Sequence, residues 1–505
     1  MLFFNTDNIN KLLLINKAGK ELIVCGSLFR GLCTLLNLDD IDTEKYYKNT
    51  EGEKTFVVSC EEKVSVVGVV STIHADNRNL SVFFVGKGYG SQDTAKLVST
   101  RLLMKVDSRD IFESYADAST LQANSFLPKY KHSFTFSFQN DIFAYFLFSR
   151  TNGRNDNSNY TFVSRLCQSD KHYYSYMELQ LNCSLADKTQ TLNTPRSAYV
   201  TEAGEHLAKI LMQKEEVAPQ DQLLFVLFSS DDTVVQNPSS ALCIYPLKAI
   251  NERLESIQSS CYSDGGIKDE KQAAFTPYLF DQSGEAICLK PRKNIMKQYR
   301  CGDDFLPTPV GTTPEFALSS KAVISYSESL TAVAVAVENG HSVAFLGNEQ
   351  GSIYKVHLAA EGRQYEKLNV GKTRVNKQLL FDKSQDNLYV TMEKKITRIP
   401  VQNCERWTDC QSCIKQQDPY CGWCVLEGKC TRRAACPLAA ENNHWLWSPD
   451  QKCIEINSFE PKIINANILV CEPPSAQDIP STPQEKGKTV SPIRSITGIV
   501  QHTVL

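Results

Sequence analysis

The sequence predicts an all-β protein in which a β-propeller, a closed ring of repeated sheets, is followed by a small cysteine-rich domain. Short apolar runs bounded by Gly, Asn or Asp recur from the N-terminus to about residue 400, which is typical of antiparallel strands. About four hundred residues of short strands are too many for one β-sandwich. At this size, a closed ring of sheets protects the sheet edges. In addition, eight of the 18 cysteines fall between Cys404 and Cys453.

Strand signals can be followed through residues 1–403. Residues 12–15 and 22–24 flank a Lys-Ala-Gly-Lys turn and predict a hairpin. The clearest later runs are residues 80–86, 134–138, 143–148, 223–228, 343–347, 388–390 and 396–399. A half-repeat, Val-x-Phe-[Val/Leu]-Gly-x-x-x-Gly, begins at Val82 and again at Val343, which favours related blades over the alternative of two unrelated β domains. Helical patterns are confined to a few places, such as residues 202–213 and 249–257.

Composition and charge favour a secreted protein and give no sign of a nucleic-acid partner. Charged residues make up 22% of the chain and the formal net charge is −3, whereas nucleic-acid binders usually carry a clustered basic face. The many cysteines, with glycosylation sequons at Asn79, Asn159 and Asn182, indicate the oxidising secretory route.

The two ends of the chain differ from the rest. The first 20 residues lack the basic start and unbroken apolar run of a secretory signal, and no run of about 18 apolar residues predicts a membrane span. We therefore expect a piece of a longer secreted or membrane-anchored protein. Residues 457–505 are rich in Pro and polar residues, so we expect a disordered tail.

The cysteines between Cys404 and Cys453 could hold zinc or form disulfides. Cys410-x-x-Cys413 and Cys421-x-x-Cys424 resemble two zinc knuckles. Only seven residues separate these pairs, fewer than the roughly 12 to 20 usual in ribbon sites, and one zinc ion would leave four cysteines without a role. The spacing favours disulfides, but it leaves all the pairings of eight cysteines open.

Outside the cysteine-rich stretch, the sequence shows no motif of catalysis or metal binding. The eight histidines are scattered, and neither His-Glu-x-x-His nor Gly-x-Ser-x-Gly occurs. Residues 86–90, Gly-Lys-Gly-Tyr-Gly, lack the Gly-Lys-Ser/Thr ending of a phosphate loop. We therefore predict no catalytic residue, cofactor or metal ligand, and expect a role in recognition by loops on a rigid scaffold.

Several motifs carry a family resemblance. Asp418-Pro-Tyr-Cys-Gly-Trp-Cys424, followed by Cys430-Thr-Arg-Arg and Trp445-Leu-Trp447, resembles the plexin–semaphorin–integrin (PSI) module of plexins. Residues 8–33, 164–183 and 388–404 are similar to stretches of plexin sema domains, so the resemblance covers roughly residues 5–456. Two short phrases, at residues 343–347 and 443–447, favour the B type.

The resemblance implies a seven-bladed sema propeller over residues 1–403, with an incomplete first blade, and a disulfide-rich PSI domain over residues 404–456. It also implies eight disulfides: Cys25–Cys33, Cys167–Cys301, Cys183–Cys243, Cys261–Cys288, Cys404–Cys421, Cys410–Cys453, Cys413–Cys430 and Cys424–Cys436. It assigns no partner to Cys60 or Cys471.

The implied function is that of a cell-surface receptor, acting outside the cell, that binds a dimeric semaphorin in cell guidance and adhesion signalling. Plexin sema domains meet semaphorins edge to edge, and the matching stretch here is about residues 86–110. Its charged candidates for partner binding are Lys96, Arg101, Asp107, Arg109 and Asp110. The alternatives are a semaphorin-like ligand and an ectodomain like that of the hepatocyte growth factor receptor group.

Overall fold

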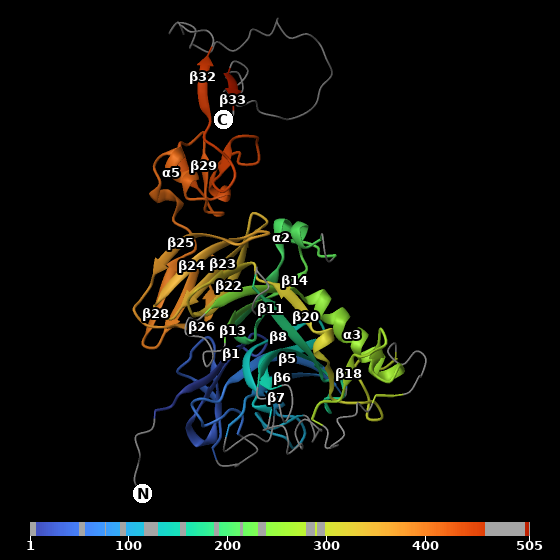
Figure 1. Cartoon of the computed structure of the whole chain (residues 1–505). Helices are drawn as coiled ribbons and strands as arrows, with labels where there is room; N and C mark the ends of the chain where they lie inside the picture. Colours follow the sequence, from blue (N-terminus) through green and yellow to red (C-terminus); the bar gives the residue numbers. More distant parts are fainter. Residues whose placement is uncertain are drawn as a thin grey trace, which may run out of the picture. The chain divides into compact units, whose positions relative to one another are not determined.

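The chain forms two compact units, residues 1–401 and 402–505, in the computed structural model (Figure 1). The structure describes residues 7–49, 56–75, 77–90, 97–115, 130–151, 158–185, 191–212, 216–230, 239–278, 288–289, 298–459 and 500–503.

Within its described residues, the first unit consists of six large sheets, which follow one another in chain order. The first sheet holds β1 (Asn10–Asn16), β2 (Glu21–Gly26), β3 (Cys33–Asn37) and β4 (Glu44–Tyr47), and the second holds β5 (Val66–Ala75), β6 (Arg78–Lys87) and β7 (Val98–Leu102). The third is built on β8 (Ser133–Asn140), β9 (Phe143–Thr151), β10 (Asn159–Cys167) and β11 (Met177–Ser184), and the short strands β12 (Thr191–Leu192), β18 (Ala274–Phe275), β19 (Val310–Thr312) and β20 (Leu318–Lys321) extend it.

The fourth to sixth sheets complete this series. They hold β13 (Thr194–Glu202), β14 (Gln222–Ser229), β15 (Ser240–Pro246) and β21 (Ile324–Tyr326); then β22 (Leu330–Glu338), β23 (His341–Asn348), β24 (Ser352–Leu358) and β25 (Arg363–Asn369); then β26 (Val375–Phe381), β27 (Asn387–Met392) and β28 (Lys395–Pro400). Neighbouring strands are antiparallel except where β19 and β20 run parallel to β11. A separate hairpin joins β16 (Ile267–Lys268) to β17 (Lys271–Gln272).

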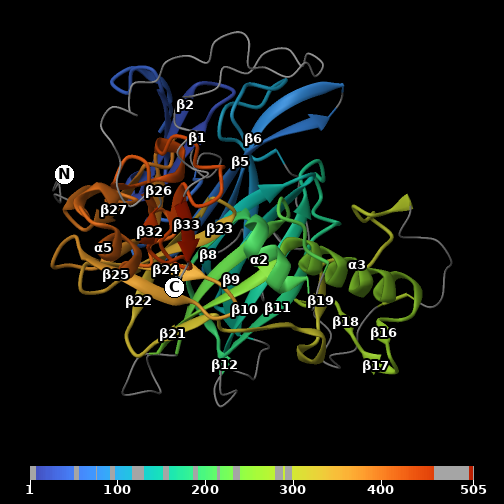
Figure 2. The same ribbon diagram turned by 90° about the horizontal axis from the view of Figure 1, so that it is seen from above.

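Successive sheets pack face to face, which is the arrangement of a propeller. Separate apolar clusters join the first sheet to the second, the second to the third, the third to the fourth, and the fourth to the fifth. Phe345 and Phe381, 5.5 Å apart between ring centroids, continue the series from the fifth sheet to the sixth. Strands β1 and β26, the first strands of the two end sheets, lie near each other in both views (Figures 1 and 2) and line the same cavity. Six sheets are described, so the count of seven blades stays a prediction.

Two helices occupy the stretches with a helical sequence pattern. Helix α2 (Gly204–Leu211) lies against β23, and α3 (Leu247–Ser263) packs against β11 and β18 on the outside of the third sheet (Figure 2). The buried residues of α3 recur every three or four positions, as expected for an amphipathic helix: Leu247, Ile250, Leu254, Ile257 and Cys261. Short 3₁₀ turns lie at Leu28–Arg30 and Pro314–Phe316.

The second unit is small and cross-linked. It contains the 3₁₀ turns Cys404–Arg406 and Arg433–Ala435, the helix α5 (Cys410–Lys415), and a sheet of β29 (Gly422–Cys424), β30 (Lys429–Thr431) and β31 (Trp445–Trp447). The carboxylate of Asp409 caps α5 by accepting a hydrogen bond from the Ser412 N–H at 2.8 Å. The stretch predicted to be disordered includes the end of β32 (Glu455–Phe459) and all of β33 (Val500–Thr503), which pair with each other. The rest of that stretch lies outside the described residues.

Eight disulfides join the same pairs of cysteines that the family resemblance implies: Cys25–Cys33, Cys167–Cys301, Cys183–Cys243, Cys261–Cys288, Cys404–Cys421, Cys410–Cys453, Cys413–Cys430 and Cys424–Cys436. Four of them lie in the second unit, where the described apolar cluster is small. Such crosslinks compensate for a core too small to hold a fold alone. Cys60 is half-buried and Cys471 lies outside the described residues.

Candidate functional site

The candidate recognition residues surround strand β7. Arg101 lies within the strand, while Asp107, Arg109 and Asp110 lie in the loop that follows it. This loop folds back so that Ser114 pairs with Arg101 and the turn closes between Val106 and Arg109. Lys96 lies outside the described residues. The structure therefore brings three of the five candidates together in one exposed or half-exposed loop.

Arg101 is not a surface charge, because its side chain is only 2% exposed. Its guanidinium donates hydrogen bonds to the Phe112 carbonyl at 3.2 Å and to the Phe56 carbonyl at 3.0 Å, and its Nε donates to Ser99 Oγ at 3.2 Å. A buried cation needs such partners. Arg101 thus holds the loop in shape and offers little surface for direct contact with a partner.

Asp107 and Arg109 present charge at the turn of the loop. Asp107 is exposed, has a left-handed backbone conformation with φ of 53°, and forms an ion pair with Arg78 at 3.4 Å. Arg109 is half-buried and donates a hydrogen bond to the Tyr115 carbonyl at 2.9 Å. An exposed pair such as Asp107–Arg78 contributes little stability, so these charges are available for recognition.

Asp110 is tied into the loop on both sides. Its carboxylate lies 3.2 Å from the Lys48 ammonium and 3.6 Å from that of Lys105, and it accepts a hydrogen bond from the Ile111 N–H at 2.9 Å. Burial acts to raise its pKa, but the hydrogen bonds from Ile111 and Lys48 outweigh burial, so the pKa of Asp110 lies below its ordinary value. The carboxylate stays charged in the extracellular pH range.

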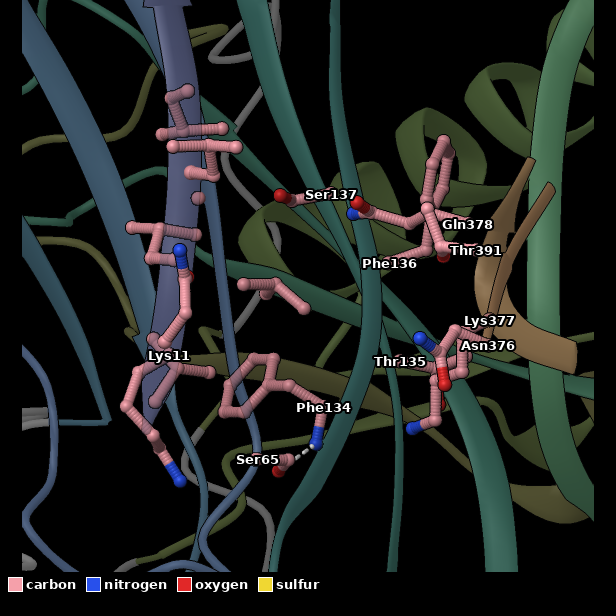
Figure 3. A pocket seen from close by; sticks show the side chains of 17 residues that line it. Lys11, Ser65, Phe134, Thr135, Phe136, Ser137, Asn376, Lys377, Gln378 and Thr391 are labelled. Atoms are coloured by element: carbon pink, nitrogen blue, oxygen red, sulfur yellow. Dashed lines mark hydrogen bonds between the residues drawn. The ribbon is translucent and has the colours of Figure 1, made fainter. Parts of the chain in front are cut away.

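A cavity of about 460 Å³ lies where β1, β5 and β8 face the last sheet (Figure 3). Lys11 and Lys377 line it, and none of its lining residues is acidic. The Lys11 ammonium already donates hydrogen bonds of 2.7 to 2.8 Å to the carbonyls of Glu61, Glu62 and Val64. Lys11 is therefore engaged in holding the segment before β5.

A buried ionic network in the third sheet is a feature that the sequence did not reveal. Arg150 Nη2 lies 2.6 Å from Glu178 Oε2, with both side chains at most 1% exposed. The other carboxylate oxygen accepts hydrogen bonds from the hydroxyls of Tyr176 and Tyr278. The Arg150 guanidinium also lies 3.9 Å from the centroid of the Phe162 ring, in cation–π contact. The Arg150 and Glu178 charges are thus paired with each other, and their contacts hold β9, β10 and β11 together.

Among the residues that the structure describes, no group of three or more His, Cys, Asp or Glu side chains is placed to hold a metal ion. The loop after β7 contains carboxylates, amines and guanidinium groups. Charged groups of this kind can pair with opposite charges on a partner surface.

Two family models match the chain. The Sema domain model matches residues 196–382, and the PSI (plexin repeat) model matches residues 403–454. Plexin-B2 of Mus musculus is 35% identical over 464 residues, which covers 90% of this chain and 24% of that protein. The chain belongs to the plexin family.

Solved structures agree with this plexin assignment. The extracellular region of Plexin A4 aligns with a TM-score of 0.74 and 26% identity, covering 89% of this chain and 45% of that one. A chain from the complex of Drosophila Plexin A with Semaphorin 1b shares the fold, with a TM-score of 0.54 and 14% identity. The alignment covers 88% of this chain and 84% of that one. The match to Plexin-B2 supports the B type, and this plexin region spans about a quarter of the length of that relative.

The sema and PSI domains place this plexin region outside the cell, at the cell surface. None of the helices in the described ranges is both long and apolar enough to cross a membrane. Of the predicted glycosylation sites, Asn79 and Asn159 are exposed, whereas Asn182 is half-buried in β11 and its side-chain amide accepts a hydrogen bond from Gln180. Glycan attachment at these three sites stays a prediction.

Proposed function

We propose that this chain is the ligand-recognition part of a plexin receptor and binds a semaphorin through its sema domain. The observation that carries the proposal is the 35% identity to Plexin-B2 across 90% of the chain, with the Sema and PSI matches in the same order. Drosophila Plexin A has been solved in complex with Semaphorin 1b, which supports the choice of partner.

The proposed role is binding rather than catalysis. A rigid propeller can vary its loops without disturbing its blades, and the loop after β7 has the charges of a recognition surface. If the semaphorin is a dimer, one ligand engages two receptor chains, and avidity then favours clustered receptors.

Within this surface, Asp107 is the residue best placed for direct contact because it is exposed and lies at the turn of the loop. Arg109 and Asp110 support it, and we keep Lys96 as a candidate from the preceding segment. Charges at the rim of an interface change the association rate and partner choice more than the total affinity. Arg101 has an indirect role, because it fixes the loop from beneath.

The test is surface binding of the purified, glycosylated chain to dimeric semaphorin ectodomains. We expect Asp107→Lys to change the association rate by about 3- to 10-fold, and the change to shrink at high salt. Asp39→Lys is the matched control, because Asp39 is also an exposed carboxylate in a surface ion pair but lies near the first sheet. A monomeric semaphorin should bind with weaker apparent affinity than the dimer.

A folded chain that binds no semaphorin, but binds a plexin ectodomain or a growth factor in the same panel, would favour one of the two alternatives. A semaphorin-like ligand would capture the plexin, and a receptor like the hepatocyte growth factor receptor would capture the growth factor. Equal effects of Asp107→Lys and Asp39→Lys would place the contact elsewhere on the sema domain.

A further inference from the structure

Three histidines from three elements meet on the surface of the fifth sheet. His206 comes from α2, His341 from the start of β23, and His357 from β24. The His206 and His341 rings stack with their centroids 3.4 Å apart and their planes at 19°. His357 Nε2 lies 3.3 Å from His341 Nδ1. One of these two nitrogens therefore carries a hydrogen and the other does not, which requires a neutral ring on the accepting side.

Charged side chains of both signs surround this histidine cluster. Lys209 of α2 acts on His341, and Arg363, paired with His357 across β24 and β25, acts on His357. Two carboxylates face the cluster from neighbouring elements: Glu205 of α2, near the turn before His341, and Glu338 of β22, opposite His341 in the hairpin. Burial, these cations and the neighbouring imidazoles lower the pKa of His341 and of His357. Protons on these rings would place positive charge beside Lys209, Arg363 and the other imidazoles, which disfavours the charged form although two carboxylates lie nearby.

Burial strengthens this effect. His341 is 7% exposed, His357 is half-buried and His206 is exposed. Burial, with the neighbouring His206 and His357, lowers the pKa of His341 to about 3. Burial and Arg363 lower the pKa of His357 to about 4. Both rings are neutral at the pH outside cells.

The cluster joins α2 to the sheet. The His206 N–H donates to the Gly340 carbonyl at 3.1 Å, and Ser342 Oγ donates to the Ala203 carbonyl at 2.7 Å. The apolar face of α2 is buried through Leu207 and Ala208. Together with these contacts, the histidine stack attaches the helix to the sheet, so charging it weakens the attachment of α2.

We propose that His206, His341 and His357 form an acid-sensitive latch that holds helix α2 on the fifth sheet at extracellular pH and loosens it in an acidified compartment. Opening lets the rings take up protons that the closed cluster excludes. The folded-state values lie below the ordinary value near 6.5, so the open state binds more protons and closure weakens as the pH falls from about 6.5 towards 4.

The test is hydrogen–deuterium exchange of the intact chain at pH 7.5 and pH 5.0, corrected for the intrinsic exchange rate, on peptides covering residues 204–211. Each ring that protonates only after opening raises the opening constant about 30-fold at pH 5.0. We therefore expect protection of α2 to fall by at least about 30-fold. In His341→Gln/His357→Gln the fall should be below about threefold.

Two further variants keep the result clear if the double variant fails to fold. His206→Gln changes an exposed ring and should reduce the fall in protection without unfolding the domain. His74→Gln, an exposed histidine of β5 outside the cluster, should leave the fall unchanged. Protection of α2 that is the same at both pH values in the unmodified chain, or that falls equally in all variants, would overturn the latch.

Discussion

The middle sheets and the two end sheets of the propeller both contain strands with continuous apolar runs, but the surroundings of these strands differ. Strand β14 in the fourth sheet is buried on both faces, from Leu223 to Ser229. Strand β1 is also apolar on both faces, yet its Leu13 and Ile15 are each 53% exposed. In the sixth sheet Leu380 is 58% exposed and Ile396 is 71% exposed. A strand with apolar side chains on both faces is normally buried on both. In the end sheets, the described residues bury only one face of such strands.

The largest expected effect in the middle sheets comes from Glu178→Ala. This change leaves the Arg150 guanidinium buried without its carboxylate, which costs about 3–5 kcal/mol of unfolding free energy. The comparable change near the edge, Asp39→Ala, removes an exposed partner of Lys20 at 3.1 Å and should cost below about 1 kcal/mol. Thermal unfolding of both variants checks the difference, and equal losses would contradict it.

Removing a disulfide should also cost more stability in the middle sheets than in the first sheet. Cys183–Cys243 joins the third sheet to the fourth with a sequence separation of 60, whereas Cys25–Cys33 joins β2 to β3 within the first sheet with a separation of 8. From loop length alone, replacing the two pairs by Ala should cost about 4 and about 2.5 kcal/mol. Denaturant unfolding of the two double variants measures both values, and a larger loss for the short loop would reverse the prediction.

Apolar truncation gives a direct comparison of one residue type. Leu227 in β14 is fully buried, so Leu227→Ala should cost about 2–5 kcal/mol. Leu13→Ala removes a half-exposed side chain and should cost about 0.5 kcal/mol. If both variants lose the same stability in the same urea titration, the outer face of β1 is covered in solution.

Acid should also act on the core of the third sheet. Burial, with help from Arg150, holds the pKa of His132 well below its ordinary value, and its Nε2 lies 2.9 Å from the Tyr278 hydroxyl. In acid, His132 is therefore protonated in the unfolded chain but stays neutral in the folded chain. The unfolding free energy falls as the pH drops below about 6.5, by about 2 kcal/mol at pH 5. His132→Gln should reduce the fall in unfolding free energy between pH 7 and pH 5 by about 2 kcal/mol and leave the part due to His341 and His357, while exposed His74→Gln should leave the fall unchanged.

The smallest effect on stability is expected at the exposed face of the sixth sheet. Leu380→Gln/Ile396→Lys should change the melting temperature by less than about 2 °C, because both side chains are already largely in water. The same variant should reduce association seen by size-exclusion chromatography, since exposed apolar sheet faces promote it. A large loss of melting temperature would show that this face is buried in solution.

The sequence was a good guide to strands and a poor one to charged side chains. Alternating and continuous apolar runs such as residues 223–228 lie in strands because burial on one or both faces demands that pattern. The burial of Arg101 could not be foreseen, because a charge in a strand is usually at the surface, and the carbonyls that bind its guanidinium come from Phe56 and Phe112.

Long-range pairings explain the other omissions. Glu178 lies 28 residues from Arg150, and the histidine cluster collects His206 with residues more than a hundred positions later. No local spacing records such contacts, because they arise only when strands from different parts of the chain share a sheet. The family resemblance supplied the recognition stretch, but only the structure separated Asp107 at the surface from Arg101 beneath it.

The Cys167–Cys301 disulfide has a consequence for handling this protein. It spans 134 residues, and the bridges Cys183–Cys243 and Cys261–Cys288 lie within that span. A protease that cuts the chain once anywhere between residues 167 and 301 therefore leaves two pieces still covalently joined. Such a nicked receptor fragment would run as one band on a non-reducing gel and as two after reduction, so purity judged without reductant would overlook the cut.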